Sequence, residues 1–563
     1  MANFIFPDDK AEVPTILPSA TELMNRLLLS RGIEKLEEAE EFLSPNYETQ
    51  LHPPELLNQI TEACERIEEA VSNGELIAIF SDYDCDGIPG AVVLHDFFKK
   101  IGYENFQNYI PHRHYEGFGL GNKAIDKLDE DGAKLIITID CGTTNVEEVI
   151  YAKEKGIDVI ITDHHEPGET LPEAVAIVNP KLGDYPFPDL CGAAVAFKLA
   201  QAYLNRGKFD MPKGYEKWWL DMVGIATIAD MVPLVGENRV LAHFGLQVLR
   251  KSRRPGLQQL LRKARLDQRY LMEDDIGFTI GPRINAASRM DNPEDAFFML
   301  AEEDIEKAGE RVVHLEKLNN ERKTTVAQMT KEVHKRIKNF EEIPPVIVIG
   351  NPDWRPSLVG LTANKLAEEF SRPAFIWGTD GNGIYKGSCR AGGGASVVNI
   401  MQAVSEIFIE HGGHHAAGGF SVKDEHIFSL SEHLVEAAIK LGDDLYVKEE
   451  MKVDAVISLE DINQLLLEQL NSLSPFGTGN PKPLFAARNV KPRSVELFGK
   501  NKEHTKIVFQ TENGGVEGIT FFQTPNGYTK EPKSDLPCTV VGYVEKSFFM
   551  GRMQTRLRVV DIL

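Results

Sequence analysis

The chain has 563 residues, of which 42% are hydrophobic and 26% are charged, a composition typical of globular proteins and a length that predicts three or four domains. Its formal net charge of −24 is unfavourable for nucleic-acid binding, so any surface of that kind must be locally basic. The first residues, MANFIFPDDKAEV, lack the basic and apolar segments of a secretory signal, and no apolar run is long enough to span a membrane. The six cysteines form no CxxC pair, which argues against a zinc site or a disulfide framework and predicts a cytoplasmic protein.

Sequence patterns divide the chain into five regions. Residues 1–73 are polar with helically spaced apolar positions, and we expect an N-terminal helical segment there. In residues 74–300 the apolar runs LIAIF, KLIITID, DVIITDHH and AVAIVNP alternate with helical stretches, which predicts a parallel sheet with crossover helices. Residues 301–341 predict a long connecting helix, residues 342–446 a second α/β domain and the turn-rich residues 447–563 a small β-barrel. The expected fold class is therefore α/β, with two α/β domains joined by a long helix and followed by a barrel.

The segment FSDYDCDGIPGA at residues 80–91 places aspartates at alternate positions before a glycine, as the calcium loop of an EF-hand does. Such a loop requires a glutamate at its twelfth position and a helix before it. Counted from Asp82, the twelfth position is Val93, and the preceding ELIAIF run has the character of a strand. The segment therefore predicts a strand, an acidic turn and a helix, and a calcium loop is excluded.

Acidic residues follow the ends of three successive expected strands. Asp82 follows LIAIF, Asp140 follows KLIITI, and the DHH triplet at residues 163–165 follows DVIIT. The carboxyl ends of parallel strands open onto one edge of a sheet, where ligands bind. A single acid at such a position is usually a loop or helix-capping residue, but three in succession indicate a shared site.

Carboxylates gathered at one edge repel one another unless cations neutralise them. Carboxylates with one or two imidazoles suit Mg²⁺ or Mn²⁺ better than zinc, which prefers cysteine or more histidine. Two such ions bridged by one carboxylate are the arrangement used for in-line phosphoryl displacement. The residues alone therefore predict a metal-dependent phosphoesterase.

Four motifs resemble, in order, those of the DHH phosphoesterase superfamily: DYDCDG, Asp140, DHH, and Asp230 within IATIADMVPL. Longer stretches resemble one branch of it, the bacterial RecJ family of single-strand-specific 5′-to-3′ exonucleases. They begin at LLLSRGIEKLEEAEEFLSP and include PHRHYEGFGLG, CGAAVAFKLA, GPRINAASRM, KGSCRA, GGHHAAGGF and SPFGTGNPKPLF. The resemblance covers nearly the whole chain and implies a DHH catalytic domain at 74–300, a DHH-associated substrate domain at 342–446 and an OB-fold at 447–563.

The resemblance implies two Mn²⁺ or Mg²⁺ ions in each active site. The expected metal ligands are Asp82, Asp84, Asp86, Asp140, His164 and Asp230. Asp140 would bridge both ions and hold the attacking water, and Asp163 would orient His164. His165 would lie at the scissile phosphate as a hydrogen-bond donor or as the proton source for the departing 3′-oxygen. Its alternative role is only to support the loop.

The resemblance also implies a 5′-phosphate site in the DHH-associated domain. The expected substrate-binding residues are Arg283, Ser388, Arg390, Gly413, His414 and His415. The arginines offer charge-assisted hydrogen bonds, and a glycine-dense segment lets the backbone approach a phosphate closely. The alternatives are surface ion pairs for the arginines and a tight structural turn for the glycines. The chain departs from the family pattern at Ser288, usually glycine, and at residues 353–357, where the family usually carries a histidine.

Three further features bear on nucleic-acid binding. Residues 250–265 contain seven lysines or arginines and no acid, and form either a phosphate-binding surface or a solvated helix face. Tyr115 and Phe118 are either base-stacking or core residues. In the OB-like tail, Phe476 and the FFMGRMQTRLR stretch are expected strand contacts, although SPFGTGNP alternatively serves only as a domain junction.

We therefore expect a cytoplasmic, monomeric exonuclease that degrades single-stranded DNA from the 5′ end, releases 5′-mononucleotides and serves DNA repair and recombination, without membrane contact. The expected protein partners are a single-stranded-DNA-binding protein and a helicase. One alternative is a DHH phosphodiesterase for short oligonucleotides or cyclic dinucleotides, which would not need the barrel. Another is a non-catalytic replisome scaffold of the same fold, which would have lost its metal ligands. A pyrophosphatase would use neither the barrel nor the basic run.

Overall fold

The computed structural model describes residues 3–8, 12–207, 209–340, 342–379, 383–445, 450–512, 514–549 and 552–563. The chain divides into two compact units. The larger comprises Pro54–Asp230 and Val248–Glu449, and the smaller comprises Met1–Pro53, Met231–Gln247 and Glu450–Leu563. The segment expected as one N-terminal region, residues 1–73, is therefore divided between the two units.

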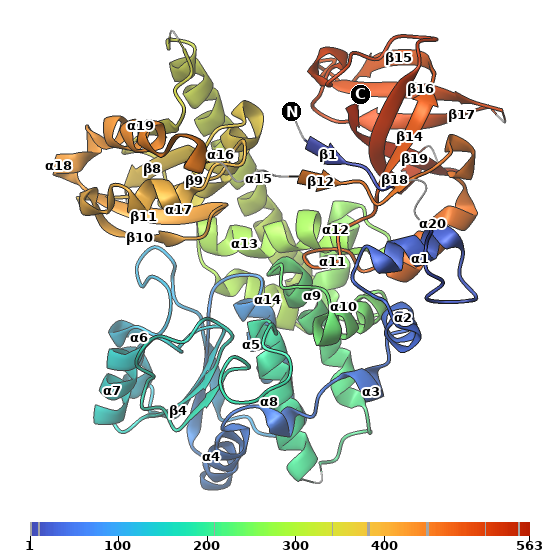
Figure 1. Ribbon diagram of the computed structural model, residues 1–563. Coiled ribbons are helices and arrows are strands. Elements are labelled where there is room, and N and C mark those ends of the chain that lie inside the picture. Colours follow the sequence, from blue (N-terminus) through green and yellow to red (C-terminus); the bar gives the residue numbers. More distant parts are fainter. Residues whose placement is uncertain are drawn as a thin grey trace. The chain divides into compact units, whose positions relative to one another are not determined.

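The larger unit contains a five-stranded parallel sheet with the strand order β3-β2-β4-β5-β6 (Figure 1). Its strands are β2 (Leu76–Ser81), β3 (Phe106–Tyr109), β4 (Ala133–Ile139), β5 (Asp158–Thr162) and β6 (Ala176–Val178). The helices around it are α4 (Ile60–Asn73), α5 (Gly87–Lys100), α6 (Asn122–Glu130), α7 (Val146–Glu154) and α8 (Gly192–Arg206). Helices α6 and α7 cover one face of the sheet, and α5 and α8 cover the other (Figure 1). Because both faces are covered, the central strands β2, β4 and β5 are mostly apolar and buried, whereas the edge strand β3 is half-buried and carries polar residues. All strand pairs of this sheet are parallel, as predicted.

After α8 the larger unit is mostly helical as far as a long connecting helix, α15 (Ile305–Ile337). The intervening elements of this unit are η2 (Tyr215–Trp219), α9 (Leu220–Ala229), α11 (Pro255–Ala264), η3 (Gln268–Tyr270), α12 (Glu273–Asp275), the π-helical turn η4 (Ile276–Ile280), α13 (Gly281–Met290) and α14 (Glu294–Ala301). Asp304 caps α15 by accepting hydrogen bonds of 2.9 Å from the N–H groups of Glu306 and Lys307.

A second five-stranded sheet follows α15, with the order β10-β11-β9-β8-β7. Its strands are β7 (Ile347–Gly350), β8 (Ala374–Thr379), β9 (Ile384–Arg390), β10 (Phe408–Gly413) and β11 (Ala417–Lys423). Its helices are α16 (Pro356–Phe370), α17 (Val397–Gln402), η5 (Ser405–Ile407), α18 (Asp424–Ile427), α19 (Leu430–Leu441) and η6 (Gly442–Leu445). Only the β7–β8 pair is parallel among these strands, so this is a mixed sheet within the predicted second α/β domain.

The smaller unit contains a seven-stranded sheet with the order β13-β14-β18-β19-β17-β16-β15. Its strands are β13 (Ala455–Val456), β14 (Leu484–Val490), β15 (Pro492–Phe498), β16 (His504–Thr511), β17 (Gly514–Thr520), β18 (Cys538–Phe549) and β19 (Arg552–Ile562). Strand β14 runs into β15 after one residue, although the two lie near opposite ends of the order. One long chain segment thus closes the sheet, as in the predicted OB-type barrel.

The N-terminal residues belong to the smaller unit through a long-range pairing. Strand β1 (Asn3–Ile5) pairs in parallel with β12 (Glu450–Lys452). The helical elements of this part of the chain are α1 (Glu22–Leu29), α2 (Leu36–Leu43), α3 (Tyr47–Gln50), α10 (Gly236–Leu249), η7 (Leu459–Asp461), α20 (Gln464–Leu473) and η8 (Pro525–Gly527), with η1 (Pro54–Leu56) at the start of the larger unit. Met24, Leu27 and Leu28 of α1 join the same apolar core as the barrel strands.

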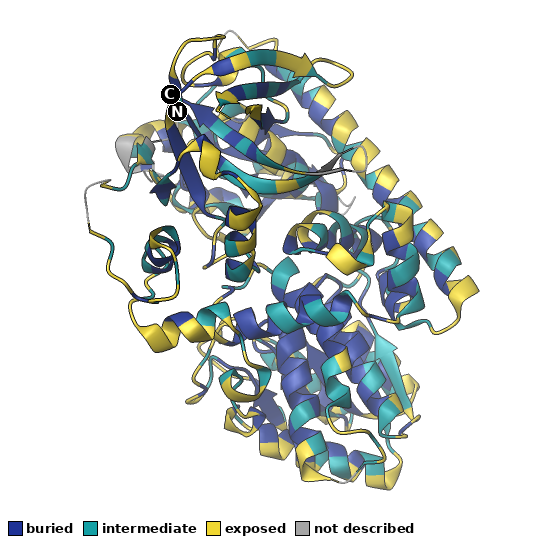
Figure 2. Ribbon diagram, turned by 90° about the vertical axis from the view of Figure 1, so that its right-hand side faces the viewer, coloured by how far each residue is buried: buried dark blue, intermediate teal, exposed yellow. Residues whose placement is uncertain are grey.

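Buried residues concentrate in the strands and on the inner faces of the helices, and exposed residues lie on the outer helix faces (Figure 2). All six cysteines are free and buried. Within the described part of the chain, none of the helices combines the length and the apolar character that crossing a membrane requires.

Candidate metal centre and substrate cleft

The ends of β2, β4 and β5 bring the predicted acids to one edge of the parallel sheet. The N–H of Asp82 donates to the carbonyl of Ile139 at 3.1 Å, and the N–H of Asp140 donates to the carbonyl of Thr162 at 2.9 Å. Asp163 continues the ladder from β5 in the same way. The ladder therefore runs one residue past the strands and fixes where each acidic loop begins.

The acidic turn after β2 is held by its own side chains. Asp84 Oδ1 accepts hydrogen bonds from the N–H groups of Asp86 at 2.8 Å and Gly87 at 3.3 Å. A Cβ on Gly87 would lie 2.4 Å from the carbonyl oxygen of Asp82. Only glycine fits this close approach, which lets α5 start directly behind the acids.

Asp86 is tied to the N-terminus of α8. Its carboxylate accepts hydrogen bonds from the N–H groups of Gly192 at 2.6 Å and Ala193 at 2.8 Å. Unpaired N–H groups and the helix dipole both favour an anion at this position. Gly192 also lies against Asp140, because a Cβ on Gly192 would be 2.6 Å from the Cβ of Asp140. Helix α8 thus positions two acids at once.

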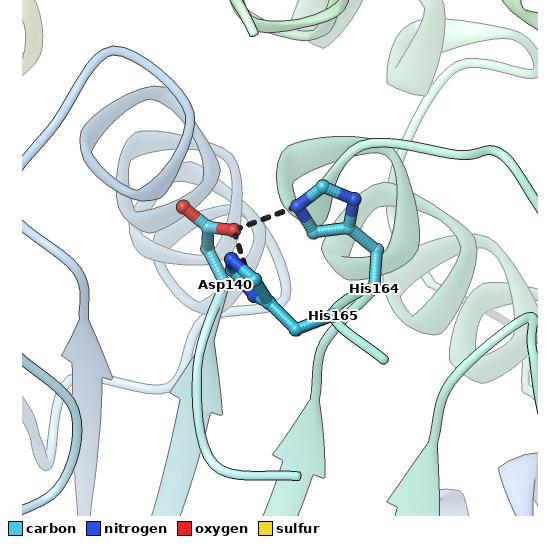
Figure 3. Close-up of side chains that lie close together, drawn as sticks. All are labelled: Asp140, His164 and His165. Carbon is cyan, nitrogen blue, oxygen red and sulfur yellow. Dashed lines mark ion pairs between the residues drawn. The ribbon is translucent and has the colours of Figure 1, made fainter. Parts of the chain in front are cut away.

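His164 lies among the acids, and Asp140 lies against both histidines (Figure 3). The His164 Nε2 atom is 3.1 Å from Asp140 Oδ1, 3.6 Å from Asp86 Oδ2 and 3.8 Å from Asp230 Oδ2. Three overlapping groups have their ligand atoms within 4.8 Å of one another: Asp140, His164 and His165; Asp86, His164 and Asp230; and Asp82, Asp84 and Asp140. The structure therefore brings all six predicted metal ligands together. Asp140 belongs to two of these groups and adopts a left-handed φ of 61°.

Burial and repulsion destabilise these carboxylates as free anions. Burial, followed by repulsion from Asp84, raises the pKa of Asp82 to about 8, and burial followed by repulsion from Asp86 raises the pKa of Asp230 to about 8. The same two causes raise the pKa of Asp140 well above its ordinary value. Among the described residues, the Oδ1 atoms of Asp82 and Asp140 are buried without a hydrogen-bond partner. Clustered orphan carboxylate oxygens with one imidazole fit divalent Mn²⁺ or Mg²⁺.

Asp163 organises the DHH loop without joining the metal cluster. One oxygen accepts from the N–H of Thr143 at 2.9 Å, and the other accepts from the N–H of His164 at 2.7 Å and from the ring Nδ1 of His165 at 2.8 Å. Although burial alone would raise the pKa of Asp163, the bond from His165 lowers it. Asp163 therefore orients the ring of His165. It contacts His164, whose ring it was predicted to orient, only through the His164 backbone N–H. Asn179 secures the loop by donating to the carbonyl of His165 at 3.0 Å.

A groove of about 580 Å³ adjoins the acidic turn within the larger unit. Tyr83 and Arg113 line it from the parallel-sheet domain, and Ser357, Lys386 and Gly412 line it from the second α/β domain. The Arg113 guanidinium lies 4.9 Å from the centre of the Tyr83 ring. Tyr83 stands between two predicted metal ligands in the sequence, so the groove borders the loop that carries them.

Arg289 joins the two domains beside this groove. Its Nη1 donates to the carbonyl of Ser357 at 2.8 Å, and the Ser357 hydroxyl donates back to the carbonyl of Arg289 at 2.8 Å. Burial, and then the like charges of Arg113, Arg322 and Arg390, lower the pKa of Arg289 to about 10. Cations held this close favour the binding of an anion.

The predicted phosphate-binding side chains divide into two kinds. Ser388 and Arg390 lie side by side against α16, because a Cβ on Gly360 would be 3.3 Å from both Ser388 Oγ and Arg390 Nη2. Arg283 instead forms an ion pair with Glu316 of α15, with 2.7 Å between Nε and Oε2. Its guanidinium is therefore already engaged inside the fold.

Gly413 ends β10, and His414 and His415 lie in the turn between β10 and β11. Gly413 has a φ of 136°, and a Cβ there would lie 2.3 Å from the carbonyl oxygen of Ala417, so the turn requires glycine. Both histidines are exposed, whereas His411 lines the groove.

Sequence reasoning misses Arg113 and Arg289. Both lie in stretches that carry the family resemblance, PHRHYEGFGLG and GPRINAASRM, and the arginines of these stretches were the available signal. Arg283 and Arg289 are six residues apart on α13, so they point about 120° away from each other around the helix. The periodicity alone does not say which of the two faces the groove.

The basic run at residues 250–265 is divided between the interior and the surface. Arg254 pairs with Asp221 at 2.9 Å and with Asp96 at 2.6 Å, and Arg250 donates to the carbonyl of Leu271. The exposed members are Lys251, Arg253, Arg262, Lys263 and Arg265. Only these five present their charges to solvent.

The aromatic residues predicted to contact the strand also differ in their exposure. Tyr115 and Phe118 are 76% and 55% exposed, and the Phe118 ring lies 5.6 Å from that of His165, so neither is a core residue. Phe476 packs against the core of the smaller unit. In the FFMGRMQTRLR stretch, residues 550–551 lie outside the described residues, and Arg556 pairs with Glu545 at 2.6 Å.

Three family models match the chain. The DHH family N-terminal domain matches residues 76–227, the DHHA1 domain matches residues 344–444 and the RecJ OB domain matches residues 453–561. The fold class is confirmed, since these matches fall on the parallel-sheet domain, the second α/β domain and the barrel.

Several relatives are named single-stranded-DNA-specific exonuclease RecJ. The one from Bacillus subtilis is 37% identical over 92% of this chain, which spans 65% of that relative's length. Those from Haemophilus influenzae and Escherichia coli are 31% and 30% identical, with 88% and 91% of both chains covered.

Solved structures extend the likeness to the three-dimensional level. RecJ from Thermus thermophilus in complex with Mn²⁺ has a TM-score of 0.80 at 27% identity, covering 96% of this chain and 76% of that one. The same protein in complex with Mg²⁺ has a TM-score of 0.74 at 25% identity, covering 96% and 74%.

Proposed function

Because the chain belongs to the RecJ family of single-stranded-DNA-specific exonucleases, we propose that it hydrolyses single-stranded DNA from the 5′ end and serves DNA repair and recombination. The observation that carries the proposal is the convergence of all six predicted metal ligands at one edge of the sheet. A non-catalytic scaffold would have no use for acids whose burial destabilises the fold. A phosphodiesterase for cyclic dinucleotides would have no use for the OB domain at residues 453–561.

The residues of the metal centre suit two ions that share one carboxylate. Asp82 and Asp84 would hold one ion, Asp86, His164 and Asp230 would hold the other, and Asp140 would contact both. When bound, two Mn²⁺ or Mg²⁺ ions would stabilise the developing charge on the phosphate and lower the pKa of the attacking water. The low pKa of His164, caused by its burial, keeps its imidazole neutral and able to act as a ligand.

His165 is suited to give a proton to the departing 3′-oxygen. Its hydrogen bond to Asp163 raises the pKa of the ring and occupies Nδ1, which leaves Nε2 as the free donor. The side chain is 47% exposed, so Nε2 is accessible to a bound strand. General-acid catalysis of this kind contributes roughly 10²–10⁴-fold.

The 5′ polarity would come from a clamp on the terminal phosphate. Arg390 and Ser388 are the predicted members, and the charges that act on Arg289 add Arg289 and Arg113 to the same site. A terminal phosphate carries more charge than an internal phosphodiester and gains more from such donors. A strand end fixed beside the metal centre would be cut to 5′-mononucleotides.

The proposal extends to the cellular compartment, the oligomeric state and the protein partners. Six free, buried thiols suit the reducing cytoplasm. We expect a monomer that works with a single-stranded-DNA-binding protein and a helicase, because a helicase supplies the single strands that the enzyme consumes.

The test is digestion of single-stranded DNA labelled at the 5′ or the 3′ end, with sizing of the products. We expect mononucleotides from the 5′ end, and faster cleavage of a 5′-phosphorylated strand than of a 5′-hydroxyl strand. Arg390→Ala and Arg113→Ala should each shrink that preference by about tenfold or more, because each removes a charge-assisted bond worth about 1.5–3 kcal/mol. Lys365→Ala is the matched control, since Lys365 is an exposed cation on α16 outside the groove.

Products that start from the 3′ end would refute the polarity. An Arg390→Ala variant that slows both substrates by one common factor would refute the clamp and leave Arg390 as a general backbone contact.

A further inference from the structure

Helix α13 runs between the two sites that the proposed function requires. At its N-terminus, a Cβ on Gly281 would lie 3.6 Å from Sγ of Cys85, which stands between two predicted metal ligands in the sequence. At its C-terminus, Arg289 and Met290 are hydrogen-bonded to the second α/β domain, which carries the predicted clamp for the terminal phosphate. The 10 residues of α13 span about 15 Å. Helix α13 therefore connects the acidic turn with the second domain as one rigid element.

The carbonyl groups at the end of α13 accept hydrogen bonds from outside the helix. Such carbonyls have no partner within their own helix, and cations are favourable beside them. The Arg289 carbonyl accepts from Ser357 Oγ at 2.8 Å and from His114 Nε2 at 3.3 Å. The Met290 carbonyl accepts from Arg355 Nη1 at 3.1 Å. The loop before α6 and the start of α16 are thus both bonded to the end of α13.

Side chains of α13 complete the same contact in the opposite direction. Arg289 Nη1 donates to the Ser357 carbonyl at 2.8 Å, so Arg289 and Ser357 bond each other twice. Two bonds fix the orientation of the pair as well as its distance. Met290 packs against the apolar core of the second domain that contains Trp354. We call Arg289, Met290, Arg355 and Ser357 the α13–α16 junction.

The second-domain half of the junction is fixed in place and borders the substrate groove. Arg355 is the N-cap residue of α16, and Pro356 is its first residue. Pro356 and Ser357 line the groove of about 580 Å³. The side chains that bond α13 come from residues 353–357, the segment in which this chain departs from the family pattern.

We propose that the α13–α16 junction fixes the distance between the metal centre and the clamp for the terminal phosphate, and thereby limits each product to one nucleotide. The proposal rests on the proposed function, in which one domain holds the strand end and the other cuts. If the domains moved apart, the second phosphodiester of the strand would reach the metal centre, and dinucleotides would be released. Ser357 and Arg355 are therefore positioning residues. A contact that served stability alone would affect unfolding and leave the product length unchanged.

The test uses the full chain with Mn²⁺ and a single-stranded oligonucleotide whose 5′-phosphate is labelled, so that the first product is sized directly. Ser357→Ala removes the hydrogen bond to the Arg289 carbonyl, and Arg355→Ala removes the one to the Met290 carbonyl. Each variant should raise the ratio of dinucleotide to mononucleotide about two- to twelvefold, the factor that one hydrogen bond contributes. The double variant should raise it further. The preference for a 5′-phosphate should remain, because the side chains of the clamp are unchanged.

A second measurement does not depend on cleavage. Spin labels on cysteines introduced at Lys123 of α6 and Lys440 of α19, both exposed, report the separation of the two domains. All six native cysteines are buried, so they do not compete for the label. The distance distribution of the metal-free double variant should be broader than that of the wild type.

Two control variants match the substitutions. Thr324→Ala removes a hydroxyl that donates to the Asn320 carbonyl of its own helix at 2.9 Å, and Lys365→Ala removes an exposed cation of α16 outside the groove. Both should give wild-type products and distances, and thermal unfolding confirms that every variant is folded.

A double variant that releases only mononucleotides would overturn the proposal, whether or not its distance distribution broadens. An unchanged distance distribution in that variant would overturn it independently of cleavage. A wild type that releases no product from the 5′ end would instead refute the proposed function.

Discussion

At the scale of single residues, the metal centre depends on the contact between Gly192 and Asp140. A Cβ at position 192 would lie 2.6 Å from the Cβ of Asp140, inside any permitted contact. Gly192→Ala should therefore displace Asp140 and reduce metal-dependent turnover by about 100-fold, since misplacement of a catalytic group by 1 Å has that effect. Gly309→Ala is the control, because position 309 on α15 has open space around it and should gain about 0.5–1 kcal/mol of stability. Metal titration calorimetry and steady-state rates report the outcome, and an unaltered metal affinity in Gly192→Ala would contradict this geometry.

Asp140→Asn separates catalysis from stability. It keeps the shape of the side chain but removes a charge that burial and Asp86 make unfavourable in the folded state. Turnover should fall more than about 100-fold, as it does when other charge-stabilising groups are lost. The metal-free protein should instead gain about 0.5–2 kcal/mol in its free energy of unfolding, the usual range when strained functional residues are relieved. Urea unfolding in the presence of a chelator checks the second part, and a less stable metal-free variant would argue against the repulsion.

At the scale of elements, the basic segment that precedes α11 contains two adjacent arginines in different surroundings. One forms ion pairs inside the fold, and the other faces solvent. Arg254 bonds both Asp221 and Asp96, so Arg254→Ala leaves two acids without their cation and should cost about 3–5 kcal/mol. Arg253 is exposed and lies 5.5 Å from the centre of the Trp218 ring, so Arg253→Ala should cost no more than about 1 kcal/mol. Urea denaturation of the two variants side by side is the measurement. Equal losses would mean that the ion pairs of Arg254 do not hold this segment in place.

These elements also show where sequence reasoning succeeds and where it stops. The acids at the strand ends can be predicted from the sequence because β2, β4 and β5 are buried on both faces and therefore form apolar runs. The parallel order of these strands brings their carboxyl ends together. Helix faces are harder to assign, because Arg283 and Arg289 occur in the same helix and only packing against Glu316 and Ser357 distinguishes them. The basic run presents the same difficulty. Its sequence does not show which arginine is buried, because that depends on where the fold places Asp96 and Asp221.

At the scale of the whole molecule, the features that the sequence does not predict are the pairings between segments far apart in the chain. Residues 1–53 belong with residues 450–563, partly because β1 pairs with β12 over more than 440 positions. Neither three-residue strand has a pattern that names its partner, so a helical N-terminal segment was the natural expectation for residues 1–73. The barrel could be predicted as a class from its turn-punctuated strands, whereas the register between those strands could not.

Metal binding should govern how the stability of the whole protein depends on pH. Without metal, the pKa values of Asp82 and Asp230 rise from 3.8 to about 8, so the folded state binds more protons than the unfolded state between about pH 4 and pH 8. Stability falls with increasing pH wherever the folded state holds the extra protons, so this contribution is present below about pH 4 and is lost by about pH 8. Bound Mg²⁺ would stabilise the ionised carboxylates and remove the slope. The rise in melting temperature on adding Mg²⁺ should therefore grow steadily from pH 5 to pH 8, as measured by calorimetry in matched buffers with Mg²⁺ or with EDTA. A rise that stays constant or shrinks over this range would show that these acids are not the ones that the metal neutralises.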